Sequence, residues 1–123
     1  MGYLTDRKRA AGMGSAKSGT EHFWHMKVSS VALLILIPLF IFTFGTAVGE
    51  DHAYVVAYFA RPLPSLIAAL TLVVGFEHFK FGSMVMIEDY VHGIAQKICI
   101  MGVTCLSYAA MATGLFALAK MAF

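Results

Sequence analysis

The sequence predicts an all-α membrane protein with three transmembrane helices. Of its 123 residues, 59% are hydrophobic and only 13% are charged, whereas a typical soluble domain has about 25% charged residues. Three apolar stretches are each long enough to cross about 30 Å of hydrocarbon as a helix. We therefore expect an N-terminal segment over residues 1–27 and one three-helix membrane domain over residues 28–123, with spans at about 28–48, 62–87 and 98–119.

The first expected span runs from Val28 to Val48 and contains no charged residue. Pro38 lies mid-span, where proline can kink a helix and is tolerated in membranes if neighbouring groups satisfy the freed carbonyl. A cleaved signal peptide is the rival interpretation. The segment before this stretch is long, however, and the apolar run exceeds a typical signal core, so we expect an uncleaved transmembrane helix.

The second expected span begins at a proline. The sequence Arg61-Pro62-Leu63-Pro64 interrupts an apolar region, and proline is accepted in the first turn of a helix but resisted in its interior. We therefore expect a helix from Pro62 to Met86 or Ile87. The preceding residues 54–58 are expected to form a short interfacial piece, with tyrosines at the level of the lipid headgroups.

The third expected span, Ile98 to Ala119, is uncharged and is closed by Lys120. Its small residues, including Gly102 and Gly114, permit close approach of a neighbouring helix. No internal repeat is evident in the chain.

The distribution of basic residues predicts the orientation. Five lie before the first span (Arg7, Lys8, Arg9, Lys17 and Lys27) and Lys97 follows the second, while only Arg61 and Lys120 lie on the other side. By the positive-inside rule, the N-terminus and the expected loop over residues 88–96 are cytoplasmic and the C-terminus is periplasmic.

His78 is the first candidate functional residue, because an ionisable side chain within a span is costly. Gly75 and Gly82 lie on the same helical face, which would leave a smooth surface for a flat macrocycle beside an axial imidazole. The alternative is a histidine that is hydrogen-bonded to a neighbouring helix. One histidine cannot form a bis-histidine haem site, so a haem would require a second ligand from another chain.

Asp89 and Tyr90 form a second candidate site, about 16–18 Å along the helix from His78. A tyrosine hydroxyl oriented by a carboxylate can donate a hydrogen bond to a quinone carbonyl. The alternative is an interfacial tyrosine beside a solvated acid. Lys27 lies on the same side of the membrane and could meet an acidic propionate or, as the simpler interpretation, an anionic lipid headgroup.

Glu77 and Lys80 are three residues apart and could form an ion pair, or Lys80 could extend towards the headgroups. The sequence contains no phosphate-binding loop, nucleophile elbow, His-x-x-x-His pair or basic aromatic surface for nucleic acid. Three helices with one histidine in a span cannot hold a complete redox centre, so we expect a subunit of a larger complex.

These residues resemble a known family. The pattern His78-x-x-x-Gly82 followed by Glu88-Asp89-Tyr90-Val91, together with the segment over residues 19–30, is similar to the small hydrophobic membrane anchor of succinate dehydrogenase, respiratory complex II. The resemblance extends from about Ser15 to the C-terminus. Its specificity lies in the spacing between the histidine and the Asp-Tyr pair.

The resemblance implies specific roles. His78 would be an axial ligand of haem b, with the other ligand from the companion membrane anchor of the complex. Tyr90 would hydrogen-bond ubiquinone, with Asp89 as its acidic neighbour. Lys27 lies where the family often has an arginine near a haem propionate, and lysine lacks the bidentate fork of arginine.

The resemblance also implies partners and location: a flavoprotein and an iron–sulfur protein, at the cytoplasmic face of a bacterial inner membrane. The related alternative is an anchor of the fumarate reductase type, which would pass electrons from menaquinol in the opposite direction. An alternative of a different class is a non-redox structural subunit that uses His78 only for helix packing.

Overall fold

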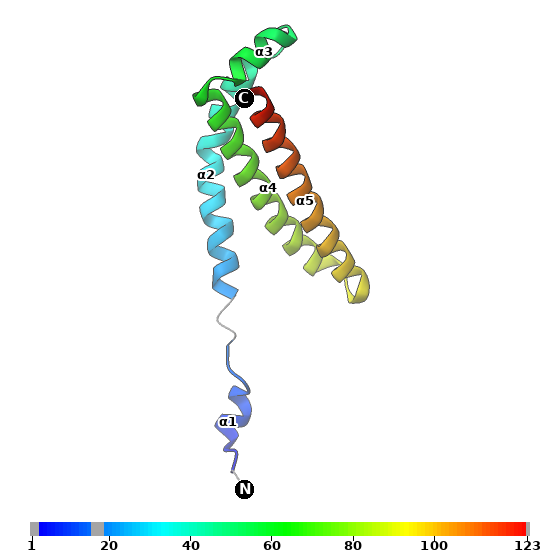
Figure 1. The fold of residues 1–123 in the computed structure, drawn as a ribbon. Helices are drawn as coiled ribbons and strands as arrows, with labels where there is room; N and C mark the ends of the chain where they lie inside the picture. The colour runs from blue at the N-terminus through cyan, green and yellow to red at the C-terminus, as the bar shows by residue number, and fades with distance from the viewer. Residues whose placement is uncertain (1–2, 16–18, 123) are drawn as a thin grey trace.

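The chain is entirely helical in the computed structural model, which describes residues 3–15 and 19–122 (Figure 1). Its elements are α1 (Asp6–Ala11), α2 (Gly19–Gly45), α3 (His52–Phe59), α4 (Pro62–Tyr90) and α5 (Gly93–Ala122). The expected N-terminal segment over residues 1–27 lies partly outside the described residues, and so does its Lys17.

Three of the helices are long and apolar enough to cross a membrane, which confirms the predicted fold class. They are α2 with 27 residues, α4 with 29 and α5 with 30. At 1.5 Å per residue they measure about 40–45 Å, which exceeds the roughly 30 Å of the hydrocarbon core. The extra length lies outside the expected spans: α2 begins well before Val28, and α5 extends beyond the expected span at both ends.

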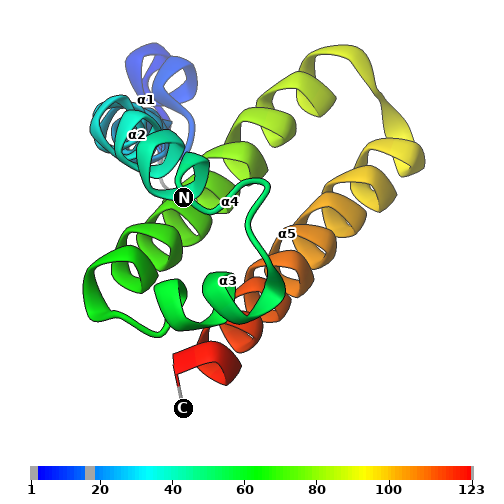
Figure 2. The same ribbon diagram turned by 90° about the horizontal axis from the view of Figure 1, so that it is seen from above.

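Helix α4 is the central element. It packs along α2 on one side and α5 on the other, and both views show it between them (Figure 2). Within the described part of the chain, α2 and α5 make no close contact with each other. The three long helices therefore form a row rather than a closed bundle, and large apolar faces of α2 and α5 stay exposed.

The small hydrophobic core lies at one end of this row. Ala47, Phe59, Ala68 and Leu118 are buried there, where the turn after α2, α3, the start of α4 and the end of α5 meet. Helix α3 is capped by Asp51, whose carboxylate accepts a hydrogen bond of 3.0 Å from the Tyr54 backbone N–H. The polar candidate residues lie away from this core, along α4.

The two ends of α4 can be compared with the ends expected from the sequence. It begins at Pro62, at the position expected from the proline, because the first turn of a helix does not need that N–H. At its other end the expected loop over residues 88–96 is wrong. The helix continues through Tyr90 because no proline or glycine occurs over residues 83–92, and only residues 91–92 separate it from α5. Gly93 has a φ of +71°, a conformation that glycine adopts at little cost.

Candidate functional site

His78 lies in the middle of α4 and faces α2. Its Nδ1 is 2.9 Å from the hydroxyl oxygen of Ser29 on α2, and both side chains are partly buried. The same hydroxyl lies 2.7 Å from the carbonyl oxygen of His25 and 3.1 Å from that of Met26. In the described part of the chain, the other ring nitrogen, Nε2, makes no hydrogen bond and is not buried. One edge of the imidazole is thus held by α2, and the other edge remains accessible.

An apolar groove of about 450 Å³ opens beside His78. Apart from His78, its lining comes entirely from α2: Ser30, Leu33, Leu34, Ile37 and Pro38. Ligand sites of this size are typically concave and apolar, with a few polar groups that fix orientation. The groove with its single imidazole has that character.

Of the two glycines expected to lie beside His78, Gly82 faces α2, as His78 does, and Gly75 lines a different groove. A Cβ atom at Gly82 would lie 3.7 Å from the Met26 methyl group on α2. Gly75 lines that other groove together with Phe40, Phe76 and Phe79 among others. The groove next to the imidazole is therefore lined by α2 rather than by the two glycines. Spacing along α4 alone could not reveal this because the lining comes from another helix.

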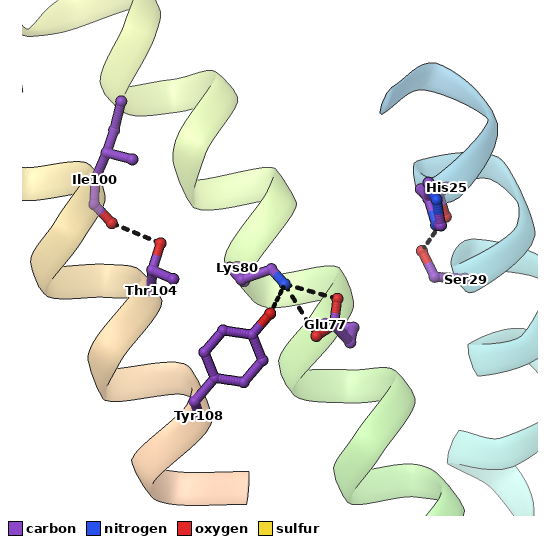
Figure 3. A network of polar contacts seen from close by, with 7 residues as sticks. All are labelled: His25, Ser29, Glu77, Lys80, Ile100, Thr104 and Tyr108. Carbon is purple, nitrogen blue, oxygen red and sulfur yellow. Dashed lines mark hydrogen bonds and ion pairs between the residues drawn. The ribbon is translucent and has the colours of Figure 1, made fainter. Parts of the chain in front are cut away.

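A polar network around the buried Lys80 connects α4 with α5 (Figure 3). Lys80 is only 6% exposed, and its Nζ donates hydrogen bonds of 2.9 and 2.8 Å to the two carboxylate oxygens of Glu77. It also donates a bond of 2.8 Å to the Tyr108 hydroxyl on α5. The expected Glu77–Lys80 ion pair is thus present, and the alternative in which Lys80 extends to the headgroups is wrong.

Two further histidines lie against α4 at the same end of α2. The His25 ring stacks on the Phe81 ring with centroids 5.6 Å apart, and the His22 ring meets the same phenylalanine edge-on at 5.0 Å. His25 also lines an apolar groove of about 290 Å³ between α2 and α4, together with Ser29 and Glu77. The imidazole-rich start of α2 therefore packs next to the polar centre of α4.

Asp89 and Tyr90 lie in the last turn of α4 and are exposed, Tyr90 by 81%. Neither side chain makes a hydrogen bond or ion pair to any other described residue. Because α4 is continuous, Tyr90 lies about 18 Å along the axis from His78. The structure therefore presents the phenol at the end of the helix row, well separated from the imidazole.

Lys27 is exposed on α2, with its Nζ 5.4 Å from the centre of the Phe23 ring. It precedes Ser29 by two residues, about 200° around the helix. Since Ser29 faces α4, Lys27 points away from α4, and the structure does not bring it to His78.

Sequence reasoning missed two residues. Ser29 is the partner of His78, and Tyr108 is a partner of Lys80. A signal existed for Tyr108, because an amine within a span needs a polar partner and Tyr108 is a hydroxyl in the middle of the third span. No comparable signal pointed to Ser29, since the pairing of two helices far apart in the sequence cannot be read from either helix alone.

The described residues contain no cluster of three or more histidine, cysteine, aspartate or glutamate side chains that could hold a metal ion by themselves.

Comparison with known proteins gives a consistent assignment. The family model of the succinate dehydrogenase/fumarate reductase transmembrane subunit matches residues 1–119. A succinate dehydrogenase hydrophobic membrane anchor subunit from Paracoccus denitrificans is 45% identical over 121 residues, covering 98% of this chain and 94% of the relative. A succinate dehydrogenase membrane anchor subunit from Reclinomonas americana is 29% identical over 85 residues, covering 67% and 71%. No solved structure gives a significant match.

Proposed function

The chain belongs to the family of succinate dehydrogenase/fumarate reductase transmembrane subunits, and on that premise we propose that it helps to hold haem b and to form the quinone site of a succinate:ubiquinone oxidoreductase. It is a multi-pass membrane anchor subunit, a component of a complex rather than an enzyme on its own. The observation that carries the proposal is the accessible imidazole of His78 above an apolar groove within a membrane helix.

The partners follow from the chemistry that the anchor lacks. Succinate oxidation belongs to a flavoprotein, electron transfer to an iron–sulfur protein, and the second haem ligand to the companion membrane anchor. The row of helices supports such an assembly, because α2 and α5 leave apolar faces that must meet either lipid or another membrane subunit.

The proposed location is a bacterial inner membrane, with the N-terminus and the α4–α5 connection in the cytoplasm. The excess of basic residues on that side supports this orientation. A reporter fused to the C-terminus should be active in the periplasm. Reporter activity in the cytoplasm would indicate the opposite orientation. Tyr90 would then lie on the membrane face opposite to the one where the peripheral subunits are proposed to dock.

The residues around His78 fit a haem group. Imidazole is a common axial ligand of haem iron, Nε2 is accessible, and the adjacent groove is apolar and of ligand size. When bound, haem b supplies a one-electron redox centre within the membrane. His78 would hold the haem iron, and the apolar side chains of α2 would exclude water from the group.

The proposed role of Tyr90 is to position the quinone. Its phenol is exposed and makes no hydrogen bond to another described residue, so the hydroxyl is available to donate to a quinone carbonyl. Asp89 is the acidic neighbour at the same end of α4 and is proposed to favour that orientation. Lys27 remains a proposed contact for a haem propionate or a lipid phosphate. Its direction away from α4 favours the lipid.

The test uses the complete complex, captured through a tag on this chain and solubilised gently from native membranes. Succinate-dependent ubiquinone reduction that a quinone-site inhibitor blocks is the expected result. Tyr90→Phe should impair this activity while leaving succinate oxidation with an artificial dye intact. Equal loss of both activities would contradict the role of Tyr90. An intact multi-subunit preparation without any succinate-dependent activity would contradict the proposed function.

His78→Ala is the second variant, and it should perturb the optical spectrum of the b-type haem. An unchanged spectrum would assign the ligand elsewhere. Complete absence of a haem Soret band from the intact wild-type complex would favour the non-redox structural role.

The family also includes fumarate reductase subunits, so the opposite direction of turnover is the second candidate. The same preparation discriminates between the two. Preferential fumarate reduction with a menaquinol analogue would indicate the fumarate reductase type, and preferential ubiquinone reduction with succinate would indicate the dehydrogenase.

A further inference from the structure

The contact between Ser29 and His78 joins α2 to α4 at the candidate haem ligand. Ser29 Oγ lies 2.9 Å from His78 Nδ1, and the two residues are 49 positions apart in the sequence. The serine is itself held by its own helix, with its hydroxyl 2.7 Å from the His25 carbonyl oxygen. The contact therefore connects the imidazole to the backbone of α2 rather than to a freely rotating side chain.

The positions of the hydrogens follow from the chemistry of the three groups. A serine hydroxyl has one hydrogen to donate, a carbonyl oxygen can only accept, and an imidazole nitrogen can do either. At 2.7 Å the Ser29 hydroxyl and the His25 carbonyl need a hydrogen between them. That hydrogen is the serine's only one, so towards His78 Nδ1 the Ser29 oxygen can act only as an acceptor. Both contacts are satisfied when His78 Nδ1–H donates to Ser29 Oγ.

This arrangement fixes the tautomer of the imidazole. In a neutral ring, a proton on Nδ1 leaves the lone pair on Nε2, the nitrogen that makes no hydrogen bond to the described residues and lies at the accessible edge. A metal-bound histidine commonly donates its other ring N–H to an acceptor that fixes the ring orientation. Ser29 occupies the place of that acceptor.

We propose that Ser29 is a positioning residue that holds His78 in the Nδ1–H tautomer and sets the angle of its ring, so that Nε2 is presented as the axial ligand. This inference rests on the proposed function, because it concerns the imidazole assigned to the haem. Ser29 acts through His78 and is not expected to contact iron.

The hydrogen bond has a consequence for the electronic properties of the ligand. Donation from Nδ1–H to an acceptor raises the basicity of Nε2, and a more basic ligand favours the ferric over the ferrous state. Removing the acceptor should therefore raise the midpoint potential of the haem. It should also widen the range of ring orientations, to which the electron paramagnetic resonance signal of a low-spin ferric haem is sensitive.

The experiment compares variants of this chain in the purified complex. Ser29→Ala removes the acceptor, Ser29→Cys keeps the volume but offers only a weak acceptor, and Ser29→Thr keeps the hydroxyl. Thr104→Val is the matched control: the Thr104 hydroxyl also donates to a carbonyl of its own helix, that of Ile100 at 2.7 Å, but it lies on α5, on the other side of α4 from Ser29 (Figure 3). The readouts are haem content, the potentiometric midpoint and the low-spin resonance of the oxidised complex.

Ser29→Ala and Ser29→Cys should both raise the midpoint potential and broaden the low-spin resonance, with haem retention weakened by about 10- to 100-fold. Ser29→Thr and Thr104→Val should resemble the wild type. The cysteine variant preserves packing, so it gives a result even where the alanine variant does not assemble. An unchanged potential and resonance in Ser29→Cys would overturn the inference.

His78→Ala, measured in parallel, separates the positioning role from the ligand assignment. A haem spectrum altered by His78→Ala but unaffected by the Ser29 variants would overturn the positioning role and leave the ligand assignment standing. A spectrum unaffected by His78→Ala would overturn the ligand assignment itself, and the positioning role with it.

Discussion

The network around Lys80 allows a prediction about the stability of the α4–α5 pair. Lys80 is 6% exposed and is held by the Glu77 carboxylate on its own helix and by the Tyr108 hydroxyl on α5. Glu77→Gln removes the charge that balances the buried ammonium. Tyr108→Phe removes one neutral acceptor and leaves the ion pair in place. The two substitutions should therefore differ clearly in cost.

The magnitudes follow from burial. Removing one partner of a buried ion pair costs about 3–5 kcal/mol. The side chain of Glu77 is 32% exposed, so the lower end of that range, about 3 kcal/mol, applies to Glu77→Gln. Hydrogen bonds between membrane helices contribute about 0.6 kcal/mol on average and up to about 1.7 kcal/mol. We therefore expect Tyr108→Phe to cost about 1 kcal/mol.

The assay is release of this chain from the purified complex on titration with SDS, followed by size-exclusion chromatography. Thr113→Val is the control, since its exposed hydroxyl bonds only to the Ala109 carbonyl of its own helix, and its cost should stay within about 0.5 kcal/mol. If Tyr108→Phe costs as much as Glu77→Gln, or if both match the control, the reasoning that Lys80 is held as a buried, charge-balanced cation is refuted.

Two further predictions concern glycines and use the same titration. A Cβ atom at Gly114 would lie 2.8 Å from Leu72 Cδ1, whereas one at Gly102 would meet nothing within 4 Å. Gly114→Ala should therefore be less stable than Gly102→Ala by about 1–2 kcal/mol, and equal stability would mean that Leu72 moves aside freely. Gly93→Ala should cost about 1–2 kcal/mol because its φ of +71° disfavours a side chain; no loss would show that the α4–α5 connection can adopt another conformation.

The sequence was sufficient to predict the fold class and the start of α4. Long uncharged runs have few solutions in a membrane other than helices, and a proline restricts where a helix can begin. The end of α4 was predicted too early, at Met86 or Ile87, whereas the helix includes the polar residues from Glu88 to Tyr90. A helix that emerges from the hydrocarbon into the headgroup region can carry such residues in its last turn.

Contacts between helices were the part that the sequence could not supply. Glu77 and Lys80 are three residues apart on one helix, so their pairing followed from helical periodicity. The partners Ser29 and Tyr108 depend on how α2 and α5 are placed and rotated against α4. Each of those helices is apolar on nearly all sides, so its pattern does not reveal which face turns inward.

The central place of α4 has a consequence for its rotation about its own axis. His78 and Lys80 are two positions apart, about 200° around the helix, and they are held from opposite sides by Ser29 and Tyr108. A turn of about 20° would carry a side-chain atom at a radius of about 5 Å through nearly 2 Å, more than a hydrogen bond can accommodate. The orientation of the imidazole is thus fixed by two hydrogen-bonded contacts on opposite sides of α4. Any partner that rotated α4 would have to break one of these contacts.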